Sequence, residues 1–279
     1  MTKQTDEGIA IVKVMPNCVI INSRHADFSI ERTVLEPLGA TVITIARELD
    51  EDELIQTAHE ADALLVNLSR ISKRVIDALP RLKVISRYGV GLDNIDTEYA
   101  KSKSIAVLNV PDYCTTEVAE HTIALMLSLV RGIPARSDGV KNGQWDMTEP
   151  QYTLQGQTLG IIGYGAIARA VISRCLPFLP KAILIFSNHV GSEDFQKYEN
   201  LREYMHSGTH PDDKKITELA LLFDIPVRFV TFDELLAHST IISIHTSLSP
   251  KNYHLIDAHA FSLMNRGVYI VNTARGGLI

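Results

Sequence analysis

Two kinds of segment alternate along this chain: short runs of β-branched and other apolar residues, and longer segments with helical periodicity. In the first third, the runs expected to form strands are Cys18–Ile21, Thr41–Ile45, Ala63–Val66, Val84–Ile85 and Ile105–Leu108. The segments expected to form helices lie near Ile30–Leu38, Asp52–His59 and Lys73–Leu79. Because parallel strands are connected by helices that cover both faces of the sheet, this alternation predicts an α/β fold.

The same alternation starts again at Thr158, which predicts a second unit. The further strands are expected at Leu159–Ile162, Ile183–Phe186, Val227–Val230, Ile241–Ile244 and Val268–Val271. A length of 279 residues fits two domains of about 150 residues, and we predict them at 1–109 and 110–279. The long connection Asn188–Pro226 carries two amphipathic pieces, Phe195–Met205 and Ile216–Phe223, which are expected to form two helices.

A strongly apolar helix is expected where the two units join. Pro111 interrupts the chain, and Thr115–Glu117 offers an N-cap and a first-turn acid for a helix that runs to about Arg131. This helix has almost no polar face, so we expect it to be buried as a connector between domains and as a contact of a homodimer. A lipid-seeking helix is the weaker alternative, because such a helix needs a basic polar face.

Charge and apolar patterning exclude several classes of partner. The net charge of −6 gives no basic field, so we expect no nucleic-acid partner. The longest strongly apolar stretch, Ile123–Val130, is far shorter than the roughly 20 residues of a membrane-spanning helix, so no membrane partner is expected. The N-terminal apolar cluster Ile9–Val12 is cut off by Lys13, which argues against a secretory signal and for a cytoplasmic protein.

Cysteine and histidine positions predict no metal site. The cysteines stand at wide, irregular spacing, which fits reduced thiols better than disulfides or zinc ligands: Cys18, Cys114 and Cys175. His206 and His210 are four residues apart, but they flank Ser-Gly-Thr and precede Pro211, where a helical pair of metal ligands would not hold together. A loop is expected there.

A glycine-rich turn, Gly163–Ala168, follows one expected strand and opens a helix expected to begin near Arg169. A strand that enters such a helix must turn sharply, expose backbone N–H groups and let a diphosphate approach, and Gly163 and Gly165 meet these needs. The predicted cofactor-binding residues are Gly163, Tyr164, Gly165, Ala166 and Ile167. An ordinary tight turn and a site for a methyl-donor nucleotide are the alternatives.

The residues after the next strand bear on which nucleotide is bound. Ser187 and Asn188 stand where a carboxylate would accept a hydrogen bond from the ribose 2′-OH. Without that carboxylate nothing repels a 2′-phosphate, yet no arginine stands there to clamp one. We therefore expect NAD or NADP as cofactor, with a leaning toward NADP, and assign Ser187 and Asn188 to its site.

Four strings in a fixed order carry a family resemblance: Tyr88–Asp96, Asn109–Pro111, Glu117–His121 and Val271–Gly277. Together they resemble the D-isomer-specific 2-hydroxyacid dehydrogenases, the family of D-3-phosphoglycerate dehydrogenase, glyoxylate reductase and the C-terminal-binding corepressors. The resemblance covers roughly Ala61–Ile279, with an interruption within Asn188–Pro226. It implies a flavodoxin-like substrate domain and a Rossmann-type, doubly wound nucleotide domain, with hydride transfer between NAD(P) and a D-2-hydroxy acid or 2-keto acid in the cleft between them.

The resemblance also implies roles for single residues. Val90 and Gly91 inherit the loop whose N–H groups meet the substrate carboxylate, where glycine suits a backbone that needs positive φ. Arg275 inherits the clamp on that carboxylate and the polarisation of the C2 oxygen, against the alternative of a surface arginine. Asn67 matches a position that often meets substrate. Further cofactor contacts are expected at His245, Thr246, Thr273 and Ala274, although Ser247 stands where relatives commonly have proline.

The acid/base group that the family uses is a histidine held by a carboxylate, and in relatives both lie beyond the arginine. This chain ends at Ile279 and contains neither, so the sequence looks truncated, with a nucleotide domain that lacks its last strands. Loss of general acid/base catalysis costs about 10²–10⁴-fold in rate, so weak turnover is expected. The alternative is a catalytically inactive nucleotide-binding or corepressor-like interaction protein.

Overall fold

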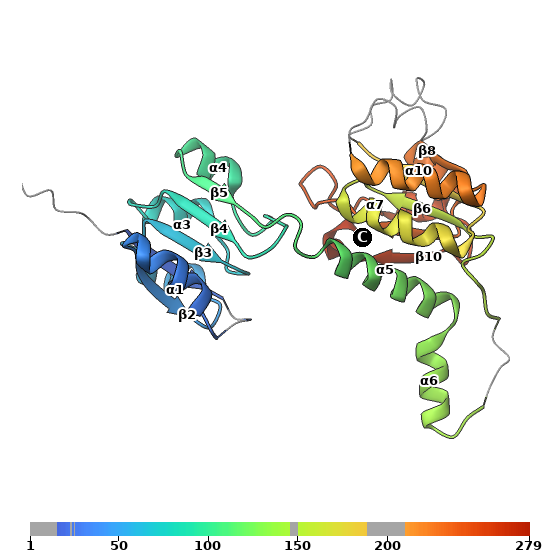
Figure 1. Ribbon diagram of the computed structural model, residues 1–279, viewed down its shortest axis with the longest axis horizontal. Coiled ribbons are helices and arrows are strands. Elements are labelled where there is room, and N and C mark those ends of the chain that lie inside the picture. Colours follow the sequence, from blue (N-terminus) through green and yellow to red (C-terminus); the bar gives the residue numbers. More distant parts are fainter. Residues whose placement is uncertain (1–15, 23, 25, 146–149, 189–209) are drawn as a thin grey trace, which may run out of the picture. The chain divides into compact units, whose positions relative to one another are not determined.

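The computed structural model describes residues 16–22, 24, 26–145, 150–188 and 210–279. The chain divides into one compact unit that ends at Tyr113 and a second that runs from Cys114 to Ile279. Each unit contains a five-stranded parallel sheet with helices packed against it (Figure 1). The predicted α/β class with two parallel-sheet domains is confirmed.

The first unit has the strand order β2-β1-β3-β4-β5, which is the flavodoxin-like arrangement. Its strands are β1 (Asn17–Ile21), β2 (Thr41–Ile45), β3 (Ala63–Val66), β4 (Val84–Arg87) and β5 (Ala106–Leu108). Its helices are α1 (Ser29–Leu35), the 3-10 turn η1 (Glu36–Leu38), α2 (Glu51–Ala58), α3 (Lys73–Ala78) and α4 (Thr97–Ser102). Helix α4 was not predicted from the sequence, and its N-cap Asp96 accepts a hydrogen bond from the Tyr99 N–H.

The central strands of this sheet are apolar because both of their faces are covered. Val19, Ile20 and Ile21 of β1 are all fully buried, two of them in the main core of the unit and Ile20 in a smaller cluster on the other face. Helix α2 begins at a complete capping box, in which Asp50 accepts from the Glu53 N–H while the Glu53 carboxylate accepts from the Asp50 N–H.

The second unit has the strand order β10-β9-β6-β7-β8, which is the order of the first five strands of a Rossmann sheet. Its strands are β6 (Thr158–Ile162), β7 (Ala182–Phe186), β8 (Val227–Phe229), β9 (Ile241–Ile244) and β10 (Tyr269–Asn272). Its helices are α5 (Thr115–Val130), α6 (Ile133–Lys141), α7 (Ala166–Cys175), α10 (Pro211–Phe223), α11 (Phe232–His238) and α12 (Ala258–Leu263), with 3-10 turns η2 (Leu176–Phe178) and η3 (Gly276–Leu278).

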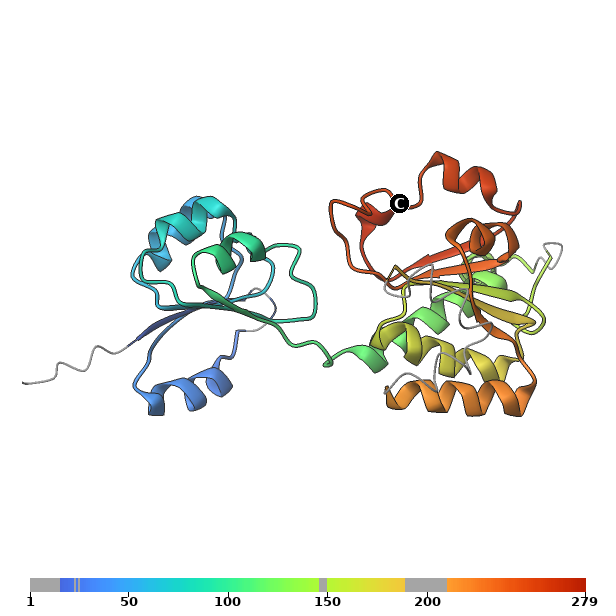
Figure 2. The same ribbon diagram turned by 90° about the horizontal axis from the view of Figure 1, so that it is seen from above.

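Two helical layers cover this second sheet. Helices α5, α7 and α10 share one apolar core, and α11 and α12 share another. In Figure 2 the yellow α7 and orange α10 lie on one side of the sheet, and the red α12 lies on the other. The carboxyl edge of the sheet, where ligands bind in open α/β folds, is the edge at which β6 enters α7.

Several local predictions need correction. The N-cap of α5 is Cys114, without a side-chain hydrogen bond, because Thr115 is already helical and so cannot act as the cap. Within its own unit α5 buries one stripe rather than its whole surface: Ala119, Thr122, Ile123, Met126 and Val130. Helix α7 begins at Ala166 and not near Arg169, which places two predicted cofactor residues in its first turn.

The long connection Asn188–Pro226 is described only in part. Its second amphipathic piece forms α10, as predicted. The first piece, Phe195–Met205, and His206 lie outside the described residues, whereas His210 is the N-cap of α10. Helix α6 was not predicted. Among the described residues, the longest apolar helices fall short of what a membrane span requires.

Candidate functional site

The turn between β6 and α7 requires glycine at its first position. Gly163 takes a φ of 99°, and a Cβ built on it would lie 2.4 Å from the carbonyl oxygen of His245. The Gly163 N–H donates to the Phe186 carbonyl at 2.7 Å, and the His245 N–H donates to the Ile162 carbonyl at 2.7 Å. Neighbouring strands therefore hold the turn from both sides, and there is no room for a side chain at Gly163.

Gly165 is a glycine for a different reason. It is the N-cap of α7 in an extended conformation, with φ −89° and ψ −171°, which any residue adopts. A Cβ at Gly165 would meet no atom within 4 Å. The described residues leave this space empty, directly before the first turn of α7.

The N-terminus of α7 is suited to an anion. The cap makes no side-chain hydrogen bond, and the first turn contains no acidic residue. The backbone N–H groups of the first turn, which includes Ala166 and Ile167, therefore stand at the positive end of the helix dipole, and no side chain in the described part of the chain accepts from them. A diphosphate is the kind of group that such a helix end binds.

The other predicted nucleotide residues follow the carboxyl ends of neighbouring parallel strands, so they lie along the same edge of the sheet. They are Ser187 and Asn188 after β7, His245 and Thr246 after β9, and Thr273 and Ala274 after β10. Ser187 is buried and Asn188 is exposed.

Tyr164 differs from the rest, because its side chain is buried and its hydroxyl donates to Asp213 of α10 at 2.7 Å. A contact between Tyr164 and the nucleotide, as predicted, would therefore involve the backbone of Tyr164 and not its side chain.

His245 is a neutral imidazole at this edge. Burial lowers its pKa from the ordinary value of 6.5 to about 4. Its Nε2 atom lies 2.8 Å from the Ser243 hydroxyl, which is itself buried. A histidine with this pKa carries no charge near pH 7 and contributes hydrogen bonds rather than a positive charge.

This shifted pKa predicts a dependence of stability on pH. Between about pH 6.5 and 4 the unfolded chain binds a proton at His245 that the folded chain does not bind, so the free energy of unfolding falls as the pH decreases through this range. We expect the contribution of His245 to reach about 3 kcal/mol. Urea unfolding at several pH values should show a shallower acid loss in His245→Gln than in the wild type.

His238→Gln is the matched control for this measurement, because His238 is an exposed histidine on α11. The carboxylates that titrate in acid are the same in all three proteins, so their effect cancels in the comparison. Equal pH dependence of wild type and His245→Gln would contradict the assignment.

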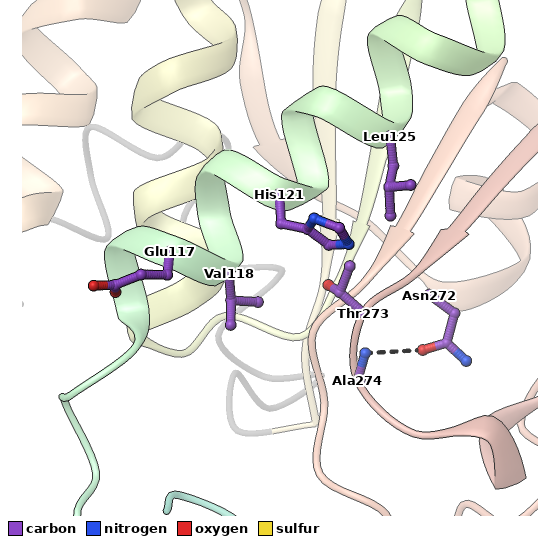
Figure 3. Close-up of a pocket in the computed structure, with 7 residues that line it drawn as sticks. All are labelled: Glu117, Val118, His121, Leu125, Asn272, Thr273 and Ala274. Atoms are coloured by element: carbon purple, nitrogen blue, oxygen red, sulfur yellow. Dashed lines mark hydrogen bonds between the residues drawn. The ribbon is translucent and has the colours of Figure 1, made fainter. Parts of the chain in front are cut away.

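An open pocket of about 580 Å³ lies between one face of α5 and the end of β10 (Figure 3). Its lining residues are Glu117, Val118, His121, Leu125, Asn272, Thr273 and Ala274. The Thr122 and Thr273 hydroxyls lie 3.0 Å apart, which connects the helix to the strand end. The pocket thus adjoins two of the predicted cofactor residues.

Asn272 organises the backbone around Arg275. The Ala274 N–H donates to Asn272 Oδ1 at 3.0 Å, the dashed line in Figure 3, and Asn272 Nδ2 donates to the Arg275 carbonyl at 2.8 Å. The Arg275 guanidinium also donates to the Ala274 carbonyl at 2.9 Å. Asn272 was not predicted as a site residue, although a polar residue at the carboxyl end of an apolar strand is a signal that could have indicated it.

In the first unit, two asparagines meet at the carboxyl edge of the sheet. Asn67, after β3, donates from Nδ2 to Asn22 Oδ1 at 3.1 Å, and both side chains are buried. Asn22 follows β1 and was not predicted. Within the described part of the chain, Asn22 Nδ2 and Arg87 Nε are buried donors that have no hydrogen-bond partner. Unpaired buried donors cost free energy, so they mark a place where an external acceptor would fit.

The loop after β4 carries the predicted Val90 and Gly91. The Asn109 side chain donates to the Val90 carbonyl at 2.8 Å and so fixes this loop to the segment after β5. The positive φ that was expected of a glycine here occurs at Gly89, at 138°, so that expectation is corrected in position. The Arg87 guanidinium also lies where a Cβ on Gly89 would be, but a flexible side chain can move aside, so it is the positive φ that favours glycine at this position.

Two of the three cysteines, Cys18 and Cys175, are buried thiols. Burial raises the pKa of Cys18 to about 11 and that of Cys175 to about 12, so both thiols stay protonated near neutral pH. No group of three or more His, Cys, Asp or Glu residues with metal-binding geometry occurs among the described residues.

The amino-acid sequence also matches a known protein family. It matches the D-isomer specific 2-hydroxyacid dehydrogenase family, catalytic domain, over residues 19–274. The chain belongs to this family. The resemblance inferred from the four sequence strings is confirmed.

Named relatives of this family are identical to the chain at about a third of the aligned positions. It is 35% identical to a D-3-phosphoglycerate dehydrogenase of Methanocaldococcus jannaschii over 88% of the chain and 42% of that protein. It is also 35% identical to a hydroxypyruvate reductase of Thermotoga maritima, over 84% of the chain and 67% of that protein. The chain therefore spans less than half the length of the first of these 2-hydroxyacid dehydrogenases.

Solved structures of the family share the fold of the chain. The D-lactate dehydrogenase of Aquifex aeolicus, complexed with NAD and lactic acid, superimposes on the chain with a TM-score of 0.76 at 27% identity. The superposition covers 94% of the chain and 70% of that structure. A glyoxylate reductase from Paecilomyes thermophila gives a TM-score of 0.75 at 26% identity, over 95% of the chain and 75% of that structure.

Proposed function

We propose that the chain acts as an NAD(P)-dependent D-2-hydroxyacid dehydrogenase, which transfers a hydride between a nicotinamide nucleotide and a D-2-hydroxy acid or 2-keto acid. The observation that carries this proposal is the uncapped N-terminus of α7 behind a glycine turn, with empty space above Gly165. Membership of the family and the NAD complex of the Aquifex aeolicus enzyme support it.

The residues at this edge of the second sheet fit a nicotinamide nucleotide. Gly165, Ala166 and Ile167 would hold the diphosphate with backbone N–H groups. Ser187 and Asn188 would meet the adenosine ribose, and as neither carries a charge they favour neither NAD nor NADP by electrostatics. The bound nucleotide supplies or accepts the hydride, and the chain positions it.

The substrate acid would be held by its carboxylate. In the second unit, Arg275 provides a permanent charge and a planar set of donors for this group. In the first unit, the N–H groups of Val90 and Gly91 are the proposed donors to a substrate carboxylate. Asn67 with Asn22 would offer amide donors from the first unit. A proton must also move at the C2 oxygen, and His245 is unsuited to this step because its pKa of about 4 leaves it neutral and weakly basic.

The test is an assay of the chain with NADH or NADPH and with glyoxylate, hydroxypyruvate or pyruvate. Nucleotide binding is measured by fluorescence titration, and turnover is measured separately by nucleotide oxidation. Binding together with reduction of a 2-keto acid would support the proposal. Binding without any turnover would favour a nucleotide-binding interaction protein, and absence of binding to a folded chain would overturn the proposal.

We further propose that α6 takes part in a homodimer contact. Helix α6 has no buried residue in the single chain, and it extends away from the sheet of its unit in Figure 1. Ile133 and Val140 on this helix are 51% and 55% exposed, and Trp145 beyond it is 83% exposed. Exposed apolar side chains grouped in this way are typical of a surface that a second copy covers.

The double substitution Ile133→Asp with Val140→Asp is expected to weaken the dimer by roughly 100-fold or more, because it places two charges in an apolar contact. Sedimentation equilibrium over a range of concentrations measures the effect. Asp138→Ala on the same helix is the control and should leave association unchanged. A wild-type chain that stays monomeric at high concentration would contradict this proposal.

A further inference from the structure

Three side chains are joined beneath the glycine turn of the second unit. The Tyr164 hydroxyl and Arg169 Nε both donate to Asp213 Oδ1, each at 2.7 Å. The side chains of Arg169 and Asp213 are 13% and 3% exposed. Tyr164 belongs to the turn and Arg169 to α7, whereas Asp213 comes from the first turn of α10. The buried carboxylate of Asp213 therefore connects helix α10 to the glycine turn.

Arg169 also contacts the backbone of the turn. Its Nη1 donates to the Tyr164 carbonyl at 2.7 Å, and its guanidinium lies 4.1 Å from the centre of the Tyr164 ring. In a trans peptide the C=O and the following N–H point in opposite directions. An Arg169 that holds the Tyr164 carbonyl therefore directs the Gly165 N–H away from itself.

Stability alone does not account for this cluster. Helix α10 also packs against the apolar core that contains α7, with Ile216 fully buried there and Leu219 and Phe223 beside it. Those contacts are sufficient to dock a helix. A buried ion pair often adds little net stability, because desolvation offsets its attraction. What the polar cluster adds is a defined orientation for one peptide of the turn.

We propose that Asp213 is a positioning residue for nucleotide binding. By holding Arg169 and Tyr164, it fixes the peptide between Tyr164 and Gly165 with its N–H toward the bound diphosphate. Docking of α10 and affinity for the nucleotide are thereby coupled. This inference rests on the proposed function, since it requires that a nicotinamide nucleotide binds at the turn.

Substitutions separate this role from a purely structural one. Asp213→Asn keeps the shape of the side chain but removes the charge that holds Arg169, and we expect the Kd for NADH to rise about 10-fold or more. Arg169→Lys keeps the ion pair but cannot reach Asp213 and the Tyr164 carbonyl together, so a similar rise is expected. Tyr164→Phe leaves Arg169 in place and should change the Kd less than either.

The double variant Asp213→Asn with Arg169→Lys tests whether both residues act through the same peptide. If they do, the Kd of the double variant for NADH does not exceed the higher of the two Kd values of the single variants. Two independent structural effects would instead multiply. Asp212→Asn, next to Asp213 on the same helix but with an exposed side chain, is the matched control and should keep the wild-type Kd.

All Kd values are measured by fluorescence titration at a temperature where circular dichroism shows each variant to be folded. If Asp213→Asn does not fold, Arg169→Lys and Tyr164→Phe decide the question. Folded variants that bind NADH as the wild type does would overturn the inference and leave the proposed function intact. A folded wild type that binds neither nucleotide would overturn the proposed function and this inference with it.

Discussion

Gly163→Ala is expected to destabilise the second unit by about 2–4 kcal/mol and to abolish nucleotide binding. Two effects add. Gly163 takes a φ of 99°, which residues with a Cβ rarely adopt, and its Cβ would lie 2.4 Å from the His245 carbonyl oxygen and 2.7 Å from the carbonyl carbon. Those atoms are backbone of the residue after β9, so they cannot rotate away. Urea unfolding measures the loss of stability.

Gly165→Ala is the matched comparison, because the two glycines belong to the same turn. A Cβ at Gly165 meets no atom within 4 Å, and the backbone there is extended. We expect its stability to stay within about 0.5 kcal/mol of the wild type. Its nucleotide affinity should still fall at least tenfold, since the methyl group takes up space that the diphosphate would need.

This pair of variants separates folding from binding. A Gly163→Ala chain as stable as the wild type would contradict the account of the turn. A Gly165→Ala chain that binds NADH with unchanged affinity would show that the empty space is not used by the nucleotide.

Arg275→Gln is expected to lower kcat/KM for a 2-keto acid by roughly 10²–10³-fold. The substitution keeps a hydrogen-bond donor but removes the permanent charge that would meet the substrate carboxylate. Arg275→Lys keeps the charge without the planar set of donors, so its loss should be intermediate. Affinity for NADH in the absence of the acid should not change in either variant.

Arg266→Gln is the control for this substitution, because Arg266 is an exposed arginine on the segment that leads into β10. It should have wild-type kinetics. If turnover is slow, the Kd of the 2-keto acid in the presence of NADH provides a second measurement. Retention of substrate affinity in Arg275→Gln would remove Arg275 from the proposed site and leave the nucleotide site untested by this experiment.

The strands of both sheets could be predicted from the sequence because buried parallel strands are nearly continuous apolar runs. Cys18–Ile21 and Ile241–Ile244, for example, lie within β1 and β9. Four helices were not predicted, namely α4, α6, α11 and α12. Helix α4 buries only Ala100, and α6 buries no residue and contains a proline and a glycine, so neither has an apolar stripe that a pattern can detect.

The residues that hold the turn and the substrate edge were harder to predict. Asp213 lies 49 residues from Tyr164, and Asn22 lies 45 residues from Asn67. Local sequence carries no signal for such pairs, because the partners meet only after the sheet and its helices have assembled. Tyr164 illustrates this: its position in the glycine motif indicated cofactor contact, whereas its side chain packs beneath the turn.

The two parallel sheets, the glycine turn and the family can be predicted from the sequence, since each depends on residue types at short spacing. The side chains that hold that turn are identified only in the three-dimensional fold. Asp213 becomes a partner of Arg169 because α10 folds back onto α7, and Asn272 braces Arg275 because the chain bends after β10. Contacts of this kind depend on the path of the chain in space, which no short stretch of sequence contains.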